Sequence, residues 1–343
     1  SRFENYSDFG SNLSGKLALR FQPTPRLVFR GAASTGFRAP GLSQNYFSHL
    51  TTSYIAGQLV EVGNYPTDNP VSQLLGAKAL KEEKSLNLSA GLAVTPRDNL
   101  TITLDVYHIK ITDRILLGAT FDDDTTLAIL ARNGYTGVGG VQYFTNGLDT
   151  KTQGIDLLAS LRVPAGLTGT LTFDAGINYT KNSITHIDPL PAALANSTEP
   201  GLIDTVTYIG ITEERPDWRG TLTTTYDRGR FHALTRASYY GKFSSAQPGY
   251  CDLCRENYGA KTLFDAEISY TFNQVKLAIG ARNLFNTYPD QPSSNTPTDP
   301  GDPNSDPAKL FNNNYGTFPW AAASPFGYNG RFLYSRVEVQ LGW

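Results

Sequence analysis

The connections between the alternating apolar–polar segments of this sequence fall into two length classes that alternate strictly. The short connections, which contain turn-forming Pro, Asp, Asn or Gly, are residues 23–26, 96–99, 164–166, 227–229 and 273–274. The long connections lie near residues 36–81, 117–151, 185–215, 246–261 and 289–329. This alternation is typical of outer-membrane β-barrels, which have short turns on one side and long loops on the other. A soluble Greek-key or propeller fold is the alternative, but a compact domain rarely contains five structureless loops of this size.

The segments between these connections show a two-residue periodicity. In residues 262–272, for example, aromatic and aliphatic residues alternate with acidic residues, serine and threonine. Because successive side chains of a strand point to opposite faces, each segment predicts a strand with one apolar and one polar face. We count about eleven such strands, including residues 12–22, 230–244 and 275–288, and most have the length that a tilted membrane strand requires. The sequence therefore predicts an all-β, transmembrane antiparallel barrel over residues 1–343.

The composition argues against several other classes of protein. The net charge is -2, with 29 basic and 31 acidic residues, and no basic stripe predicts binding to nucleic acid. No run of about 18–20 apolar residues predicts a membrane helix. Residues 1–10 do not resemble a leader, so either a leader has been removed or the sequence continues upstream. Without paired catalytic carboxylates or a nucleophile elbow, we expect no enzyme, no cofactor and no metal centre.

The number of strands raises the question of how such a barrel closes. Short turns of outer-membrane barrels face the periplasm, so the C-terminus is expected on the periplasmic side and, with eleven strands, the N-terminus on the other. Bacterial single-chain barrels have an even number of strands. An open sheet would also leave two unpaired edges in lipid, where each unsatisfied backbone group costs several kcal/mol. We therefore expect this chain to be the C-terminal part of a larger barrel, completed by the same chain or a separate one.

Six stretches in order along the chain carry a resemblance to a known family. They are GFRAP (36–40), LKEEKS (80–85), TDRI (112–115), FTN (144–146), TQGID (152–156) and NLFN (283–286), followed by an aromatic C-terminus. Together they resemble the TonB-dependent outer-membrane receptors. The resemblance implies a 22-stranded barrel around an N-terminal plug, of which this chain would be the last eleven strands. The plug, the energy-coupling box and the first half of the barrel lie outside these residues, and Glu82-Glu83 stands where the family more often has Pro-Glu.

The resemblance also implies a function. The chain would form part of an importer in the outer membrane of a Gram-negative bacterium, surrounded by lipid and coupled through its plug to TonB. Its long loops would capture a scarce nutrient, such as a ferric siderophore or another large solute. Receptors for several small-molecule substrates share these motifs, so no single substrate is predicted. The alternatives are a structural or interaction barrel, which pairs with another chain or displays its loops, and a passive porin.

Aromatic residues of the long loops are the candidates for ligand contacts. The set comprises Tyr46, Tyr135, Tyr143, Phe144, Tyr250, Trp320 and Tyr328. The end of the last loop, with Trp320 and Tyr328, fits an outer aromatic belt equally well. Trp343 also has two interpretations that are compatible. It suits a belt at the periplasmic interface, and the resemblance implies that a terminal aromatic residue is part of the barrel's assembly signal.

The two cysteines, Cys251 and Cys254, form a CxxC pair in the fourth long loop. In an exported protein such a pair predicts a small disulfide. A zinc or redox site is the alternative, but no second CxxC or nearby histidine pair completes a set of four ligands.

Three further motifs are interpreted as structural. Arg38 precedes Pro40 where a strand gives way to a loop, and Asn283 to Asn286 lie near the end of the penultimate strand. Both are predicted to shape strand ends rather than to bind a ligand. The carboxylates of residues 122–124 suit calcium, but they lack the Gly and Glu spacing of a known calcium loop, so a solvated acidic tip is favoured.

Overall fold

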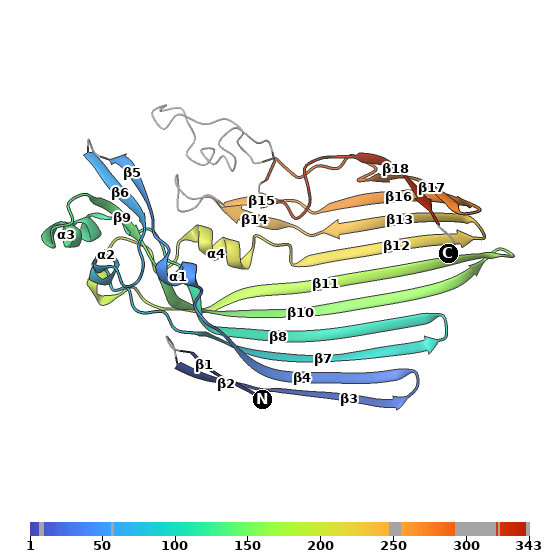
Figure 1. Ribbon diagram of the computed structural model, residues 1–343, viewed down its shortest axis with the longest axis horizontal. Coiled ribbons are helices and arrows are strands. Elements are labelled where there is room, and N and C mark those ends of the chain that lie inside the picture. The colour runs from blue at the N-terminus through green and yellow to red at the C-terminus, as the bar shows by residue number, and fades with distance from the viewer. Residues whose placement is uncertain (7–9, 56–57, 247–254, 292–319, 322, 341–343) are drawn as a thin grey trace.

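The computed structural model describes residues 1–6, 10–55, 58–246, 255–291, 320–321 and 323–340, and the structural statements below concern these residues. Figure 1 shows a broad sheet of long strands, with short helices and strands gathered beyond one end of it. None of the helices in the described ranges is long and apolar enough to cross a membrane. We call the broad sheet the wall.

The wall contains eleven antiparallel strands, which confirms the predicted fold class. In sheet order they are β18 (Phe332–Val339), β17 (Val275–Arg282), β16 (Lys261–Phe272), β13 (Phe231–Tyr240), β12 (Trp218–Arg228), β11 (Gly169–Ile187), β10 (Phe144–Ala165), β8 (Leu100–Leu117), β7 (Glu83–Arg97), β4 (Leu27–Arg38) and β3 (Lys16–Thr24). Within the described residues, β3 and β18 are the edges of this sheet and each pairs with one neighbour in it. These residues therefore form an open wall rather than a closed barrel.

Tight turns join the strands at the end of the wall away from the helices (Figure 1). Gly166, Gly229 and Asn273 lie in these turns with φ angles of 69°, 57° and 48°. Glycine and asparagine adopt this left-handed conformation at low cost, and it suits the tight connections of antiparallel strands. The short connections predicted from the sequence are therefore turns at a single end of the sheet.

Side chains of the wall alternate between an apolar face and a polar face. One row across β11, β12, β13 and β16 consists of Ala175, Leu222, Ala237 and Phe264, and the adjacent row on the other face consists of Asp174, Thr223, Arg236 and Asp265. No other part of the described chain covers the apolar face here, since Leu222 remains 47% exposed. Such a continuous exposed apolar face is unfavourable in water and suits contact with hydrocarbon.

The first three long connections are folded over their described residues, contrary to the expectation of structureless loops. The connection after β4 holds α1 (Leu42–Tyr46), β5 (His49–Ile55), β6 (Gln58–Asn64) and α2 (Pro70–Leu74). Later connections hold α3 (Asp124–Arg132) and β9 (Val138–Gln142), and then the 3-10 helix η1 (Ala192–Leu194) and α4 (Thr205–Thr212). Strand β9 pairs in parallel with β6, so segments from two different connections form one small sheet with β5.

Three predicted strands have different boundaries in the structure. Residues 12–22 are divided, because β1 (Arg2–Tyr6) and β2 (Gly10–Ser14) form a hairpin before β3 begins. The strand predicted over residues 230–244 ends at Tyr240, and β14 (Phe243–Ala246) then forms a separate hairpin with β15 (Arg255–Tyr258). The strand predicted over residues 275–288 ends at Arg282, because Asn283 and Asn286 adopt φ angles of 50° and 58°.

Candidate functional site

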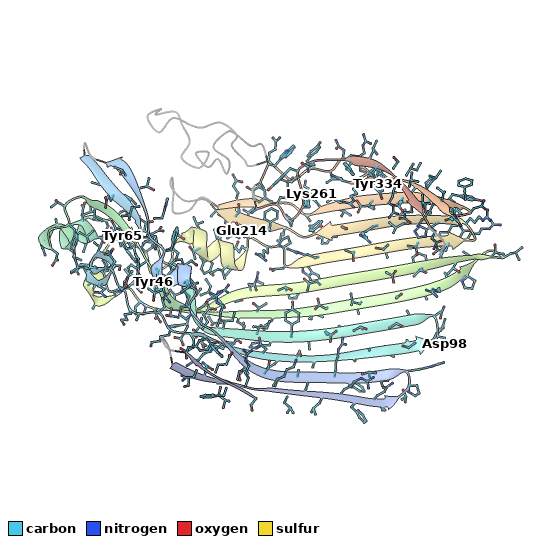
Figure 2. All side chains as sticks on the ribbon, viewed as in Figure 1. Tyr46, Tyr65, Asp98, Glu214, Lys261 and Tyr334 are labelled. Atoms are coloured by element: carbon cyan, nitrogen blue, oxygen red, sulfur yellow. The ribbon has the colours of Figure 1, made fainter. Side chains whose placement is uncertain are left out.

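Three of the long connections at the helical end of the wall share one hydrophobic core. It contains the buried side chains of Tyr65, Val71, Leu75, Phe121, Leu130, Val141, Tyr143, Leu194 and Leu202. These residues come from the connections after β4, β8 and β11, and Figure 2 labels Tyr65 among the elements gathered there. We call residues 39–82, 118–143 and 188–204 the cap. Because one core joins its three segments, the cap is a packed unit rather than a set of independent loops.

The junction between wall and cap is held by a buried carboxylate. Glu83, at the start of β7, accepts hydrogen bonds through Oε1 from the backbone N–H of Ile115 at 2.8 Å and from Arg38 at 3.2 Å. Its Oε2 lies 3.0 Å from Nε of Arg38. A two-point contact between guanidinium and carboxylate fixes geometry as well as contributing energy. The structural interpretation of Arg38 is therefore confirmed.

An asparagine connects two neighbouring segments of the same junction. Asn146 donates through Nδ2 to the carbonyl oxygens of Lys81 and Asp113 at 2.9 and 2.7 Å, and its Oδ1 accepts from the backbone N–H of Lys81 at 2.8 Å. Asp113 has a φ of 55°, and its N–H donates to Asp149 at 3.1 Å. Sequence motifs that are far apart in the chain thus meet in one hydrogen-bond network.

The motif near the end of the penultimate strand also has a structural role. The Asn283 side chain is buried, its Nδ2 donates to the carbonyl of Thr287 at 2.7 Å, and its Oδ1 accepts from the Thr287 N–H at 2.8 Å. The Oδ1 of Asn286 accepts from the backbone N–H of Arg331 at 2.9 Å, which ties the two ends of the last long connection together. The prediction of a strand-end device is confirmed.

The polar face of the wall carries contacts that cross from strand to strand. Nε of Arg30 donates to Oδ1 of Asp105 at 2.8 Å, although β7 lies between their strands. The hydroxyl of Tyr107 lies 2.6 Å from that of Thr180, and a Cβ on the intervening Gly154 would approach the Tyr107 ring to 2.2 Å. Glycine is therefore required there for the side chain to cross. Further contacts on this face are Asn178–Asp156, Ser160–Asp174, Arg236–Thr223, Tyr334–Glu267 and Arg336–Glu267.

The predicted ligand residues of the first loops are not brought into one site. Tyr46 lies on α1 and is 63% exposed. Tyr135 packs against the cap core, and Phe144 is partly buried at the start of β10. Tyr143 lies inside the core, where its hydroxyl donates to the carbonyl of Leu75 at 3.1 Å and burial raises its pKa. Its ring is therefore occupied in packing, and we no longer count Tyr143 among the ligand candidates.

The remaining candidates belong to other regions. Trp320 stacks on Tyr288, with the ring centroids 4.8 Å apart and the planes inclined by 9°. Tyr328 is partly buried. The ligand candidate Tyr250 lies outside the described residues, as do the predicted disulfide pair Cys251 and Cys254 and the C-terminal Trp343.

The acidic run at residues 122–124 begins a helix instead of forming a freely solvated tip. Asp123 is the N-cap of α3 and accepts from the backbone N–H of Thr126 at 3.0 Å and from that of Thr198 at 2.8 Å. Burial alone raises the pKa of Asp123, but hydrogen bonds from Thr126, Thr198 and Ser197 outweigh it and lower the pKa to about 2. The expectation of a solvated acidic tip was wrong for Asp123, because this half-buried carboxylate links two segments of the cap.

A pocket that the sequence patterns do not predict lies where the ends of β11, β12 and β13 meet α4 and the β14–β15 hairpin. Its volume is about 830 Å³. Its lining is rich in cationic and aromatic side chains, including Lys181, Arg215, Lys242, Arg255, Tyr179, Tyr208, Trp218 and Tyr239. Each is an ordinary strand-end or loop residue in the sequence, and only the folded chain gathers them. No cluster of three or more His, Cys, Asp or Glu residues suited to a metal ion occurs in the part of the chain that the structure describes.

Comparison with solved structures finds the same fold in two receptors and a transporter. A ferric enterobactin receptor variant from Pseudomonas aeruginosa matches with a TM-score of 0.62 and 15% identity, over 98% of this chain and 41% of that one. The siderophore receptor PirA from Acinetobacter baumannii has a TM-score of 0.59 and 15% identity, over 98% and 42%. The copper transporter OprC has a TM-score of 0.57 and 15% identity, over 95% and 39%. The chain thus spans about two fifths of the length of these proteins, and at this identity the likeness shows the fold alone.

Sequence comparison identifies the family. No curated protein sequence matches the chain. A family model described as "TonB dependent receptor-like, beta-barrel" matches residues 1–284, which is most of the chain and includes ten of the eleven wall strands and all of the cap. The antiparallel wall of this chain has one apolar and one polar face, with turns at one end and packed connections at the other. This chain therefore belongs to the TonB-dependent receptor-like β-barrel family.

Proposed function

We propose that this chain forms the C-terminal part of the barrel of an outer-membrane transporter that takes up a scarce nutrient with energy supplied through TonB. The observation that carries the proposal is the two-faced wall joined at one end to a packed cap. The apolar face would contact lipid, and the polar face would line a hydrated interior. The structural relatives, which are a ferric enterobactin receptor, a siderophore receptor and a copper transporter, support a nutrient of this kind.

The open edges of the wall indicate what else such a transporter requires. Unpaired backbone groups of β3 and β18 would be costly in lipid, so further strands, from the same chain or a separate one, would pair with them. A plug domain would lie against the polar face and contact TonB. In this arrangement the turns and the C-terminus are periplasmic, and the cap is extracellular. A ferric siderophore or another large solute would first meet the cap.

The ligand contacts are proposed at the aromatic residues that remain accessible or lie outside the described residues. Tyr46 is the candidate whose side chain is most exposed on the cap. The other candidates are Tyr135, Phe144, Tyr250, Trp320 and Tyr328. Aromatic side chains provide large contact areas with few rotatable bonds, which suits the recognition of a bulky solute.

Uptake measurements test the proposal directly. The receptor that contains this chain is expressed in cells lacking their own siderophore receptors, and uptake of radiolabelled ferric siderophores is followed with and without a functional TonB. We expect saturable uptake that requires TonB. Equal uptake without TonB would indicate a passive porin, and the absence of uptake for every solute tested would favour the structural or interaction role.

A matched pair of variants examines the ligand contact separately from transport. Tyr46→Ala should weaken binding of the transported solute by about fivefold or more, because it removes an exposed aromatic contact. The control is Tyr270→Ala, which removes a tyrosine that is 40% exposed on the apolar face near the opposite end of the wall. Equal affinities in both variants would remove Tyr46 from the site and leave the transport proposal intact.

A further inference from the structure

The pocket between the wall and α4 opens on the apolar face of the wall. At the strand ends its lining includes the apolar-face positions Tyr179, Trp218 and Tyr239. The lining does not include Arg219 and Tyr240, which are paired with each other on the polar face next to Trp218 and Tyr239. A pocket on the polar face would have included these two long side chains. Beyond the last pair with β12, the lining also includes Asn182 and Ile184 from the other face of β11. At the level of the paired strand ends, the pocket therefore opens toward the surroundings of the barrel rather than its interior.

We propose that this pocket binds the phosphorylated headgroup of a lipid in the surrounding membrane leaflet. Its aromatic side is built from Tyr179 and Trp218, whose ring centroids are 4.8 Å apart, and from Tyr239. Trp218 is 51% and Tyr239 43% exposed. Amphipathic rings of this kind settle at the membrane interface. The apolar face continues from them along the strands through Ile177 and Leu222, so the acyl chains of a bound lipid would lie against the wall.

The height of the pocket on the wall agrees with this ligand. Tyr226 and Phe231, whose rings lie 6.1 Å apart, mark the turn end of β12 and β13. Phe231 and Tyr239 lie on the same face of β13, and at the usual strand rise and a tilt of about 45° they are separated by about 19 Å across the membrane. The apolar band of such barrels is about 25 Å tall between its two aromatic belts. The pocket therefore begins near the edge of this band, where lipid phosphates lie.

The charge of the pocket also suits a phosphate. Lys181 pairs with Asp217 at 2.9 Å, and Arg255 pairs with Glu213. Arg215 and Lys242 are exposed and have no ion pair or hydrogen bond within the described ranges.

Among the described residues, two positive charges of the lining are thus left without a counterion. A guanidinium and an ammonium at the membrane edge are the groups that proteins use to hold phosphate. The lipid phosphate would neutralise Arg215 and Lys242, while the acyl chains lie against the apolar face of the wall.

Lipid retention by the reconstituted receptor tests the proposal. The receptor that contains this chain is placed in phosphatidylcholine vesicles doped with phosphatidic acid, extracted in mild detergent, and examined by native mass spectrometry for bound lipid. We expect selective retention of phosphatidic acid. The double variant Arg215→Gln/Lys242→Gln should lower this retention by about tenfold or more, since each cation near a membrane surface contributes substantially to anion binding.

The matched control changes the same two charges elsewhere at the same end of the molecule. Lys78→Gln/Arg132→Gln alters exposed cations of the cap, outside the pocket lining, and should leave retention unchanged. Equal losses in both double variants would overturn the proposal, because they would show a general charge effect. Retention unaffected by the pocket variant would overturn it as well.

Two further outcomes would assign the pocket to a different ligand. Displacement of the bound lipid by inorganic phosphate alone would show a free-anion site. Loss of solute binding in Arg215→Gln/Lys242→Gln, with lipid retention unchanged, would show a substrate site. The proposal rests on the outer-membrane location in the proposed function but not on transport. Lipid retention is measured without solute or TonB, so its failure is distinguishable from a failure of uptake.

Discussion

The wall and the cap contain similar apolar side chains in opposite environments. Leu222 of the wall is 47% exposed, whereas Leu130 of the cap is fully buried. In the wall, apolar residues alternate with polar ones and have no protein layer over them. In the cap, they converge from three connections on a single core. The comparison shows that the wall depends on its surroundings to cover its apolar face, while the cap carries its own apolar interior, as a water-soluble domain does.

This difference predicts that the two regions respond separately to mutation. The wall is held by backbone hydrogen bonds between long strands, and the cap by side-chain packing. A change in the cap core should therefore loosen the cap and leave the wall paired. A change on the apolar face of the wall should impair membrane folding without disturbing the packing of the cap. Four substitutions, described from the largest expected effect to the smallest, test this separation.

The largest effect is expected inside the cap core. Phe121→Ala removes a fully buried ring that packs on Tyr143, and should destabilise the cap by about 3–5 kcal/mol through lost burial and the cavity that remains. Hydrogen exchange should accelerate in α3 and β9 and stay slow in β12. Phe47→Ala, at a side chain that is 51% exposed, is the control and should change little. Faster exchange throughout the wall would contradict the separation of the two regions.

A charge on the apolar face of the wall should have the next largest effect. Leu222→Arg places a cation where the wall would meet hydrocarbon, at a cost of about 2–4 kcal/mol near the middle of the membrane. The matched variant is Thr221→Arg, on the neighbouring residue of the polar face, and it should fold almost normally. Folding into lipid vesicles as a function of urea concentration measures both. Equal penalties for the two variants would show that the faces are wrongly assigned.

A substitution at the junction between wall and cap should have a smaller effect on stability, and it should affect both regions. Glu83→Gln keeps an acceptor for the Ile115 N–H but removes the charge that pairs with Arg38, at an expected cost of about 1–2 kcal/mol. Exchange should accelerate at the ends of β7 and β8 before it does so in the cap core. Glu82→Gln alters a neighbouring carboxylate that pairs with Lys84, outside this network, and should cost less than about 1 kcal/mol. An effect of equal size in both would argue against a specific role for Glu83.

The smallest effect concerns the link made by Asp123. The pKa of Asp123 is about 2 in the folded cap, below its ordinary value of 3.8. At pH values above about 4, the ionised carboxylate therefore stabilises the folded cap. This contribution should disappear as the pH falls from about 4 to about 2. Asp123→Ala should cost about 1 kcal/mol at neutral pH through loss of the helix cap. Asp123→Asn should keep part of the cap but flatten the pH dependence of cap exchange, and an unchanged pH profile would contradict the assignment.

Local sequence patterns were sufficient to predict the wall. The two-residue periodicity and the turn residues specify each strand, its two faces and its short connections within a few residues of chain, and the structure confirms eleven antiparallel strands. Boundaries moved where backbone conformation changes abruptly, as at Asn283. Motifs such as the one containing Arg38 were correctly interpreted as structural, although their partners were not predicted. The pairing of Cys251 with Cys254 and the role of Trp343 stay predictions.

Tertiary structure alone decided the cap and the pocket. Tyr143 resembles an exposed loop tyrosine in the sequence, yet its environment is set by Leu75 and Phe121 from distant segments. Likewise, Lys181 of β11 and Arg255 of β15 line one pocket although they lie far apart in the chain. Strand periodicity is a property of neighbouring residues, because the extended backbone directs each side chain. Burial in the cap and charge in the pocket depend on contacts across long stretches of chain, and these exist only after the wall has brought the ends of its strands together.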